Sequence, residues 1–302
     1  MKNLLALVIL FPLIGKAQPK PLDSFFSQLR AGKYPSIPAE ASKPENATIY
    51  LNALTDYYKD TTVIIRSKAA AVTRVIGAKS TVSSVRIKAV QQLIRATRDK
   101  DSGNTGAALT YLTEFKKSDF SKTNKDSLRA LLSGNIAHAQ ILMKLVGYLE
   151  MQEVSNDLFA ISQDPKSGRK ERWTAMLALA RMDDENAIID VMNRVKRLPI
   201  GDDVVYEIFP DLIYTRRREA INYLIEALNS DAKNCESADA EREAKIPCAY
   251  RVMEMLAPVI EGYPLKLSAS GDVETKDYPA ALTIVREWFK VHSDYKILKD
   301  RF

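Results

Sequence analysis

The 302-residue sequence has few of the side chains on which most enzymes depend. It contains two histidines and two cysteines, too few for a three-histidine metal site. The common phosphate-binding, metal-binding and nucleophile motifs are also absent: there is no GxGxxG or GxxxxGK[ST] phosphate loop, no HExxH, no GxSxG and no CxxC. His138 has no Asp, Ser or Cys three or four residues further on to form a relay, and His292 lies far away in sequence. The sequence therefore predicts a protein that is not an enzyme, without a cofactor or a metal.

Long hydrophobic runs are absent as well, with one short run at the start. Leu4–Ile14 is apolar, follows Lys2, and precedes the small residues Gly15 and Ala17. A run of this length is too short to span a bilayer, and its layout is typical of a secretory signal peptide. We expect cleavage between Ala17 and Gln18, export to the periplasm or the medium, and no transmembrane segment in the mature chain.

The excess of positive charge is small. Loss of Lys2 and Lys16 with the signal peptide lowers the formal net charge by two, from +6 to +4. The remaining Lys and Arg side chains are spread among Asp and Glu, as on a solvated surface. We therefore expect no nucleic-acid partner.

The two cysteines, Cys235 and Cys248, enclose the polar stretch CESADAEREAKIPC. An isolated pair of this kind in an exported chain indicates a structural disulfide. A loop of this size would stabilise the fold by about 3 kcal/mol in the chain-entropy model. A redox or metal role is disfavoured, since no CxxC spacing and no nearby His accompany the pair.

Residues 168–228 carry the clearest helical pattern in the chain. Apolar residues recur there at i, i+3, i+4 and i+7 in four successive groups, which predicts four one-sided helices. The groups are Trp173, Met176, Leu177 and Ala180; Ile188, Val191, Met192 and Val195; Val205, Ile208, Phe209 and Leu212; and Ile221, Leu224, Ile225 and Leu228. Only short polar stretches separate them, so neighbouring helices should run antiparallel.

The first and third helices, and the second and fourth, are offset by about 33 residues. A fixed period of this size predicts stacked repeats that bury their apolar faces against one another. A helical bundle without true repeats is the alternative.

Further residue detail resembles the short variant of the HEAT family of helical-hairpin repeats. These residues are Ala175, Leu177, Ala178 and Ala180 in the first helix, Asp183 and Asp184 at the turn, Arg194 in the second helix, and Pro210 with Asp211 in the third. The resemblance implies an all-α superhelix of α-hairpins, a HEAT-like solenoid, and a role in scaffolding or partner recognition.

The expected domain organisation follows the composition of the chain. Residues 1–17 form the signal peptide, and residues 18–44 form a proline-rich leader in which only Ser24–Arg30 could make a short helical turn. Residues 45–302 form one helical-repeat domain, with a disulfide-closed insert at 235–248. The aromatic and charged final helix suits a cap for the last repeat.

Two basic clusters are candidate partner-binding residues: Arg169, Lys170 and Arg172, and Arg216, Arg217 and Arg218. In a stack of repeats they could lie along one edge and attract a carboxylate-bearing peptide, an acidic protein or an anionic glycan. The alternative is ordinary solvation and pairing with neighbours such as Glu171 and Glu219.

Two acidic pairs, Asp183 with Asp184 and Asp202 with Asp203, are the nearest approach to a glycosidase-like carboxylate site. Both pairs stand at helix junctions, where acidic side chains cap the following helix. We interpret them as capping residues.

The sequence thus predicts an exported, non-enzymatic helical-repeat protein that binds a protein partner or acts as a scaffold in the cell envelope. Its state would be a monomer or part of an envelope assembly. The alternative function is a helical-repeat enzyme, a lyase or a glycan-active protein, with a carboxylate-based site.

Overall fold

The structure is a computed structural model, and it describes residues 20–302 apart from residue 135 and residues 238–243. Within these described residues all regular secondary structure is helical, with only isolated β-bridges elsewhere, which confirms the all-α prediction. The expected signal peptide, residues 1–17, lies outside the described part of the chain. Among the described helices, none is long and apolar enough to cross a membrane.

The chain divides into two compact units, with a boundary between Ala89 and Val90 inside helix α4. The helices up to this boundary are α1 (Lys20–Arg30), the 3-10 helix η1 (Ala39–Ser42), α2 (Pro44–Tyr57), α3 (Val63–Lys79) and the first part of α4 (Ser83–Ala96). Helix α1 begins four residues before the short turn expected at Ser24, because Leu22 extends its buried apolar face of Phe25, Phe26 and Leu29. Phe26 stacks on Tyr57 of α2, with ring centres 3.7 Å apart.

The second unit contains the remaining helices and the candidate site. These helices are α5 (Ser102–Leu112), η2 (Lys117–Asp119), α6 (Lys122–Leu132), α7 (Ala139–Tyr148), η3 (Gln152–Val154), α8 (Ser155–Gln163), α9 (Arg169–Arg181), α10 (Glu185–Val195), the π-helical turn η4 (Val204–Ile208), α11 (Phe209–Thr215), α12 (Arg218–Leu228), α13 (Ala249–Leu256) and α14 (Tyr278–Val291). The four helices expected in residues 168–228 are therefore present as α9, α10, η4 with α11, and α12.

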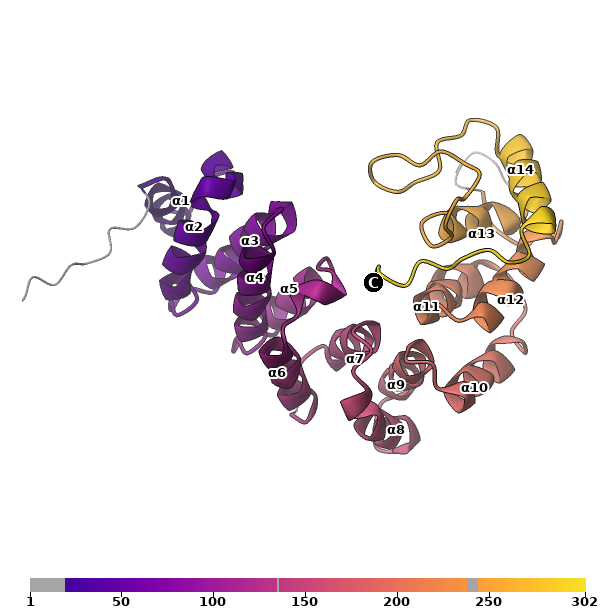
Figure 1. Ribbon diagram of the computed structural model, residues 1–302, viewed down its shortest axis with the longest axis horizontal. Helices are drawn as coiled ribbons and strands as arrows, with labels where there is room; N and C mark the ends of the chain where they lie inside the picture. Colours follow the sequence, from indigo (N-terminus) through magenta and orange to yellow (C-terminus); the bar gives the residue numbers. More distant parts are fainter. Residues whose placement is uncertain (1–19, 135, 238–243) are drawn as a thin grey trace, which may run out of the picture. The chain divides into compact units, whose positions relative to one another are not determined.

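The helices of the second unit contact one another in a regular order (Figure 1). Alternate helices pack in series, α5 on α7, α7 on α9, α9 on α11 and α11 on α13. Sequential helices also pack in pairs, α8 with α9, α9 with α10, α11 with α12, and α13 with α14. The series formed by α5, α7, α9 and α11 carries the site described below.

A 33-residue spacing recurs in the backbone of this unit. Glu150, Asp183 and Arg216 follow the ends of α7, α9 and α11, and all three have positive φ angles of 53°, 66° and 52°. This left-handed position ends many helices and is usually glycine, since a side chain makes it costly. Three non-glycine residues thus adopt the same backbone conformation at one spacing, each just after a helix of the series α7, α9 and α11.

Helices α7 and α9 approach closely at Gly147. A Cβ atom at this position would lie 2.9 Å from the Ala178 Cα atom and would also meet the Tyr214 hydroxyl. That hydroxyl donates a 2.7 Å hydrogen bond to the carbonyl of Lys144. Small residues at 147 and 178 are thus what allow α7, α9 and α11 to share one contact point.

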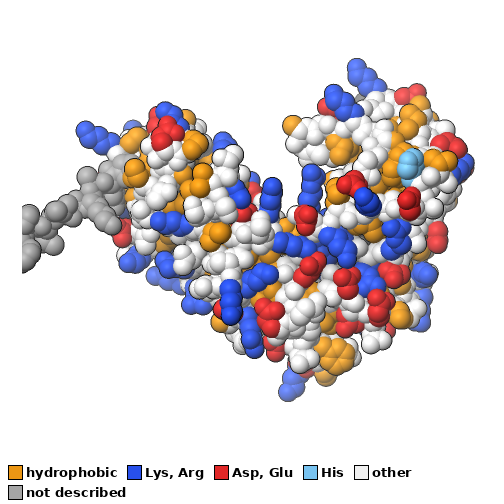
Figure 2. Space-filling model, in the orientation of Figure 1, with side chains coloured by type: hydrophobic (Ala, Val, Ile, Leu, Met, Phe, Trp, Pro, Cys, Tyr) orange, Lys and Arg blue, Asp and Glu red, His pale blue; other side chains and the backbone are white. Residues whose placement is uncertain are grey.

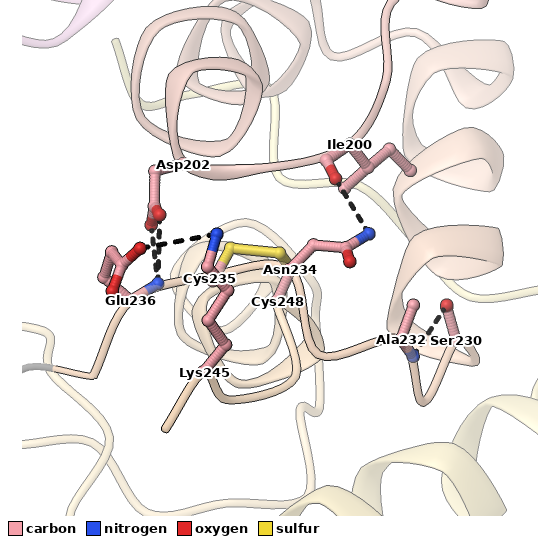
Figure 3. The surroundings of a disulfide bond; sticks show 9 residues. All are labelled: Ile200, Asp202, Ser230, Ala232, Asn234, Cys235, Glu236, Lys245 and Cys248. Carbon is pink, nitrogen blue, oxygen red and sulfur yellow. Dashed lines mark hydrogen bonds and ion pairs between the residues drawn. A yellow bond between two sulfur atoms is a disulfide. The ribbon is translucent and has the colours of Figure 1, made fainter. Parts of the chain in front are cut away.

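Cys235 and Cys248 form a disulfide, as predicted (Figure 3). An antiparallel bridge between Cys235 and Ile246 accompanies it. Asp202, two residues before the π turn, accepts a 2.9 Å hydrogen bond from the Glu236 amide, and the Asn234 side chain donates to the carbonyl of Ile200 at 3.1 Å. The disulfide-closed segment is therefore fastened to the connection between α10 and α11.

Candidate functional site: a cavity beside an arginine-bound segment

Helices α5, α7, α9 and α11 together line a cavity of about 560 Å³, which we call the Trp173 cavity. Its lining residues are Thr110 and Thr113; Gln140, Ile141 and Lys144; Lys170, Trp173 and Thr174; Glu207, Ile208 and Asp211; and Phe302. Trp173 and Ile208 belong to apolar groups that the sequence assigns to the core, yet both are only partly buried. They form an apolar wall that is open to a ligand.

Asp211 fixes one side of this cavity. Its carboxylate accepts a 2.6 Å hydrogen bond from the Trp173 indole nitrogen and a 2.6 Å charged hydrogen bond from Lys144 Nζ. The three groups come from α11, α9 and α7, so their contacts tie three helices together at the cavity wall. Trp173 consequently has a set ring orientation, as a preorganised binding surface requires.

The π turn η4 brings two further residues into the cavity, Glu207 and Ile208. It ends two residues before Pro210, which has no N–H and whose ring would clash with the carbonyl of Tyr206 in a continuous α-helix. The wider turn accommodates this break before α11 begins. Such π turns occur frequently at functional sites, because they redirect side chains that a regular helix would place elsewhere.

Two charged side chains of the cavity are available to a ligand. Lys170 and Glu207 are both exposed, and in the described part of the chain neither forms a side-chain hydrogen bond or ion pair. The Gln140 amide is likewise without a side-chain partner among the described residues. Beside its apolar wall and the paired Lys144 and Asp211, the cavity thus offers a ligand one cation, one anion and one carboxamide that have no side-chain partner among the described residues.

The cluster Arg216–Arg218 lies against the last ten residues of the sequence, residues 293–302. In Figure 1 this segment runs from the end of α14 across α12 and α11. Arg216 is 4% exposed; it donates to the carbonyls of Leu298 at 3.0 Å and Phe302 at 3.3 Å, and also to that of Ile213. Arg218 donates to the carbonyl of Tyr295 at 2.6 Å.

Arg217 points instead to acidic side chains. It donates to Glu185 at 2.6 Å and to Glu219 at 3.3 Å, and it lies 3.5 Å from Asp183. The pairing with Glu219 was the alternative expected from the sequence. These carboxylates raise the pKa of Arg217 despite the opposing effect of burial.

The cluster at the start of α9 is divided among three environments. Lys170 lines the Trp173 cavity, and Arg169 is exposed. Arg172 turns back to the loop before α9, where it donates to the carbonyls of Ser167 and, at 3.4 Å, of Pro165. The structure therefore brings Arg216 and Arg218 to segment 293–302 and Lys170 to the cavity, and the binding of a partner by any of them stays a prediction.

Arg181, at the end of α9, is a buried arginine that sequence reasoning missed. It is 2% exposed and donates to the carbonyls of Lys299 at 3.1 Å, Arg301 at 2.8 Å and Tyr214. Burial lowers its pKa, and burial together with the charge of Arg181 lowers the pKa of Arg216 to about 9. The sequence did contain a sign of this buried position. Arg181 stands in a series with a 33-residue spacing whose other members are aromatic: Phe115, Tyr148 and Tyr214.

The acidic pairs named from the sequence have local structural contacts. Asp184 caps α10 by accepting a 2.9 Å hydrogen bond from the Ala187 amide, which confirms that interpretation for Asp184. Asp183 lies 3.3 Å from Lys299 of segment 293–302. The carboxylates that line the Trp173 cavity are Glu207 and Asp211, which lie four residues apart and which the sequence analysis did not propose as a pair.

The described residues hold no group of three or more His, Cys, Asp or Glu side chains placed to bind a metal ion. The groups that line the Trp173 cavity can contact a ligand through hydrogen bonds, apolar surface and charge, and they include one pair of carboxylates. Comparisons with protein-family models, with curated proteins and with solved structures found no match to this chain.

Proposed function

We propose that this chain is an exported HEAT-like α-solenoid that binds a protein partner in the cell envelope, without enzymatic activity of its own. Two features support the solenoid: the serial packing of α5, α7, α9 and α11, and the 33-residue spacing of the left-handed residues that end the last three of them. Both are expected of hairpins stacked side by side.

One observation supports polypeptide binding above all others. Segment 293–302 lies on α9, α11 and α12, and its main-chain carbonyls accept hydrogen bonds from Arg181, Arg216 and Arg218. Side-chain donors that bind main-chain carbonyls do not depend on the sequence of the bound chain. The surface of this unit is thus built to hold an extended polypeptide, and the Trp173 cavity adjoins it at Phe302.

Export is supported by the disulfide, since such bonds persist in oxidising compartments. The mixed surface fits a protein partner better than nucleic acid: Figure 2 shows Lys and Arg interspersed with Asp and Glu over the face drawn. The N-terminal signal peptide and its cleavage after Ala17 belong to the same proposal.

Site-specific photo-crosslinking in envelope extract tests the binding function. A photoreactive residue replaces Lys170, inside the cavity, or Arg169, the neighbouring residue outside it. We expect one partner to crosslink from position 170 and not from position 169. The purified partner should then bind Trp173→Ala about tenfold more weakly than the unaltered chain, through loss of an aromatic contact.

Equal crosslinking from both positions, or none from either, would count against the cavity as a partner site. A captured protein that binds Trp173→Ala and the unaltered chain with equal affinity would also count against the cavity as the partner site. Circular dichroism of each variant establishes that the fold is retained.

A glycan-active enzyme is the second candidate, favoured by Glu207 and Asp211 lining one cavity beside Trp173. Two carboxylates near an aromatic platform are a typical arrangement for glycoside chemistry. In this reading Glu207 is the proton donor or acceptor and Asp211 the fixed carboxylate. Turnover of an envelope glycan that is lost in Glu207→Gln would establish it, whereas turnover that persists in that variant would exclude this site.

A further inference from the structure

Most of the hydrogen bonds that hold segment 293–302 are made by its main chain. Four side chains of the helices donate hydrogen bonds to its carbonyls: Arg218, Arg216, Arg181 and Tyr148, and we call the surface they form the arginine groove. The accepting carbonyls are those of Ser293 (3.4 Å) and Tyr295 (2.6 Å), Leu298 (3.0 Å) and Phe302 (3.3 Å), Lys299 (3.1 Å) and Arg301 (2.8 Å), and Asp300 (3.0 Å).

The segment also pairs with the backbone that follows α13. The Leu298 amide donates to the Val259 carbonyl at 2.8 Å, and the Glu261 amide donates to the Lys296 carbonyl at 3.0 Å. Ile260 and Ile297 form an antiparallel bridge between these contacts. This is the pattern by which an extended peptide adds to an exposed backbone edge.

Two aromatic side chains anchor the segment, seven residues apart. Tyr295 is buried; its ring lies 4.3 Å from Arg218 Cζ, and its hydroxyl donates to the Asn222 side chain at 2.7 Å. The centre of the Phe302 ring lies 5.7 Å from the ring centre of Tyr148 and 5.7 Å from that of Tyr214. Between the anchors, Lys296 and Lys299 are exposed and face Glu261 at 3.5 Å and Asp183 at 3.3 Å.

The packing of the segment is incomplete. Tyr295 is the only one of its ten residues that is buried, and cavities of about 520 Å³ and 290 Å³ lie against it. The segment is thus held by hydrogen bonds and two anchors, and little apolar surface opposes its release. Release would nevertheless cost Arg181 and Arg216 the hydrogen bonds that they donate to the carbonyls of the segment, which water would have to replace.

We propose that residues 293–302 are an intramolecular ligand of the arginine groove, and that the partner inserts an extended segment of the same chemistry in their place. That segment carries two aromatic side chains seven residues apart with basic residues between them. It supplies the same carbonyls to Arg181, Arg216 and Arg218, so the buried cations keep their acceptors during exchange. The inference rests on the protein-binding function proposed above.

The test uses the full chain with a specific protease site inserted between His292 and Ser293, both exposed. The chain is folded and then cut, so that residues 293–302 are held without a covalent link. A fluorescent peptide of sequence SDYKILKDRF is added, and its binding is followed by anisotropy.

We expect saturable binding to the cut chain and binding at least about tenfold weaker to the uncut chain, where the tethered segment competes at high effective concentration. A competitor that keeps the Tyr, the Phe and both Lys but has the other residues scrambled should displace the probe nearly as well. A competitor with Ala at both aromatic positions should be at least about tenfold weaker.

A matched pair of variants assigns the effect to the groove. Arg218→Met removes the donor to Tyr295 and should speed exchange of the peptide, while Arg169→Met, a change of equal chemistry at an exposed residue, should not. The proposal is overturned if the cut chain keeps its own segment without exchange. It is also overturned if the uncut chain binds the probe equally well, or if the double-Ala competitor is as strong as the original.

The two proposals fail in distinguishable ways. If the envelope partner crosslinks from position 170 but binds cut and uncut chains alike and does not compete with the peptide, the intramolecular-ligand proposal is wrong and protein binding stands. If the peptide exchanges as expected but no envelope protein crosslinks, the arginine groove is established as a polypeptide-binding site. The proposal that a partner binds at the Trp173 cavity is then wrong.

Discussion

The guanidinium of Arg181 donates a hydrogen bond to the main-chain carbonyl of Tyr214, 33 residues further on, and its Cζ atom lies 5.2 Å from the centre of the Tyr214 ring. The same Cζ atom lies 5.5 Å from the ring centre of Tyr148, 33 residues earlier. One buried cation therefore lies close to two aromatic rings, one 33 residues before it and one 33 residues after it. Such contacts favour a buried guanidinium, which is weakly hydrated and attracted to aromatic faces.

Replacement of Arg181 should destabilise the fold. Arg181→Met removes the donors to the carbonyls of Tyr214, Lys299 and Arg301, and a hydrogen bond to a charged group contributes about 1.5–3 kcal/mol. Relief of the buried charge offsets part of this loss, so we expect the free energy of unfolding to fall by about 2 kcal/mol. Urea denaturation measures it, with Arg169→Met as the exposed control. An unchanged midpoint would mean that the charge costs as much as its hydrogen bonds contribute.

A methyl group at position 147 should separate α7 from α9. Gly147→Ala places Cβ 2.9 Å from the Ala178 Cα atom, closer than packed atoms allow, so a helix must shift. We expect a loss of about 1–3 kcal/mol in the free energy of unfolding, despite the better helix propensity of Ala. Gly168→Ala is the control, because its Cβ would lie 3.6 Å from Glu171 in ordinary contact. A stabilised Gly147→Ala would show that α7 and α9 are not packed as described.

Reduction of the disulfide should lower thermal stability. Opening the Cys235–Cys248 loop returns entropy to the unfolded chain, and we expect a loss of about 3 kcal/mol. Thermal unfolding with and without reductant measures the shift. The Cys235→Ser, Cys248→Ser double variant should unfold at the same temperature as the reduced protein, with or without reductant. If reductant lowers the unfolding temperature of the double variant, the effect does not come from this disulfide.

Alkaline pH should destabilise the second unit through Tyr214. Burial raises the pKa of this tyrosine above its ordinary value of 10, so above pH 10 the unfolded chain has released a proton that the folded chain still holds. The free energy of unfolding should thus be insensitive to this group below pH 10 and fall as pH rises further. In Tyr214→Phe the decline above pH 10 should be shallower, at a cost near neutral pH of about 1 kcal/mol for the hydrogen bond to Lys144. Denaturation at a series of pH values gives the dependence of the free energy of unfolding on pH for both proteins. Equal slopes above pH 10 would show that Tyr214 does not cause the decline.

The sequence by itself determined the features that depend on local pattern. Apolar spacing gives the helices at α9, α10 and α12, because a one-sided helix needs nothing but its own period to be recognised. The pairing of Cys235 with Cys248 followed from the presence of only two cysteines, close together in a sequence that we expect to be exported. The capping role of Asp184 followed from its place before an amphipathic run.

Tertiary structure alone decided what the chemistry-bearing residues contact. Arg216 and Leu298 lie 82 residues apart, and Arg181 and Arg301 lie 120 apart, so no period within the chain connects them. Trp173 fits a core stripe in sequence, yet it is only partly buried, and its indole donates to Asp211 at a cavity wall. A helical pattern specifies which face is apolar, whereas the neighbour that covers that face, or leaves it open, depends on the packing of distant segments.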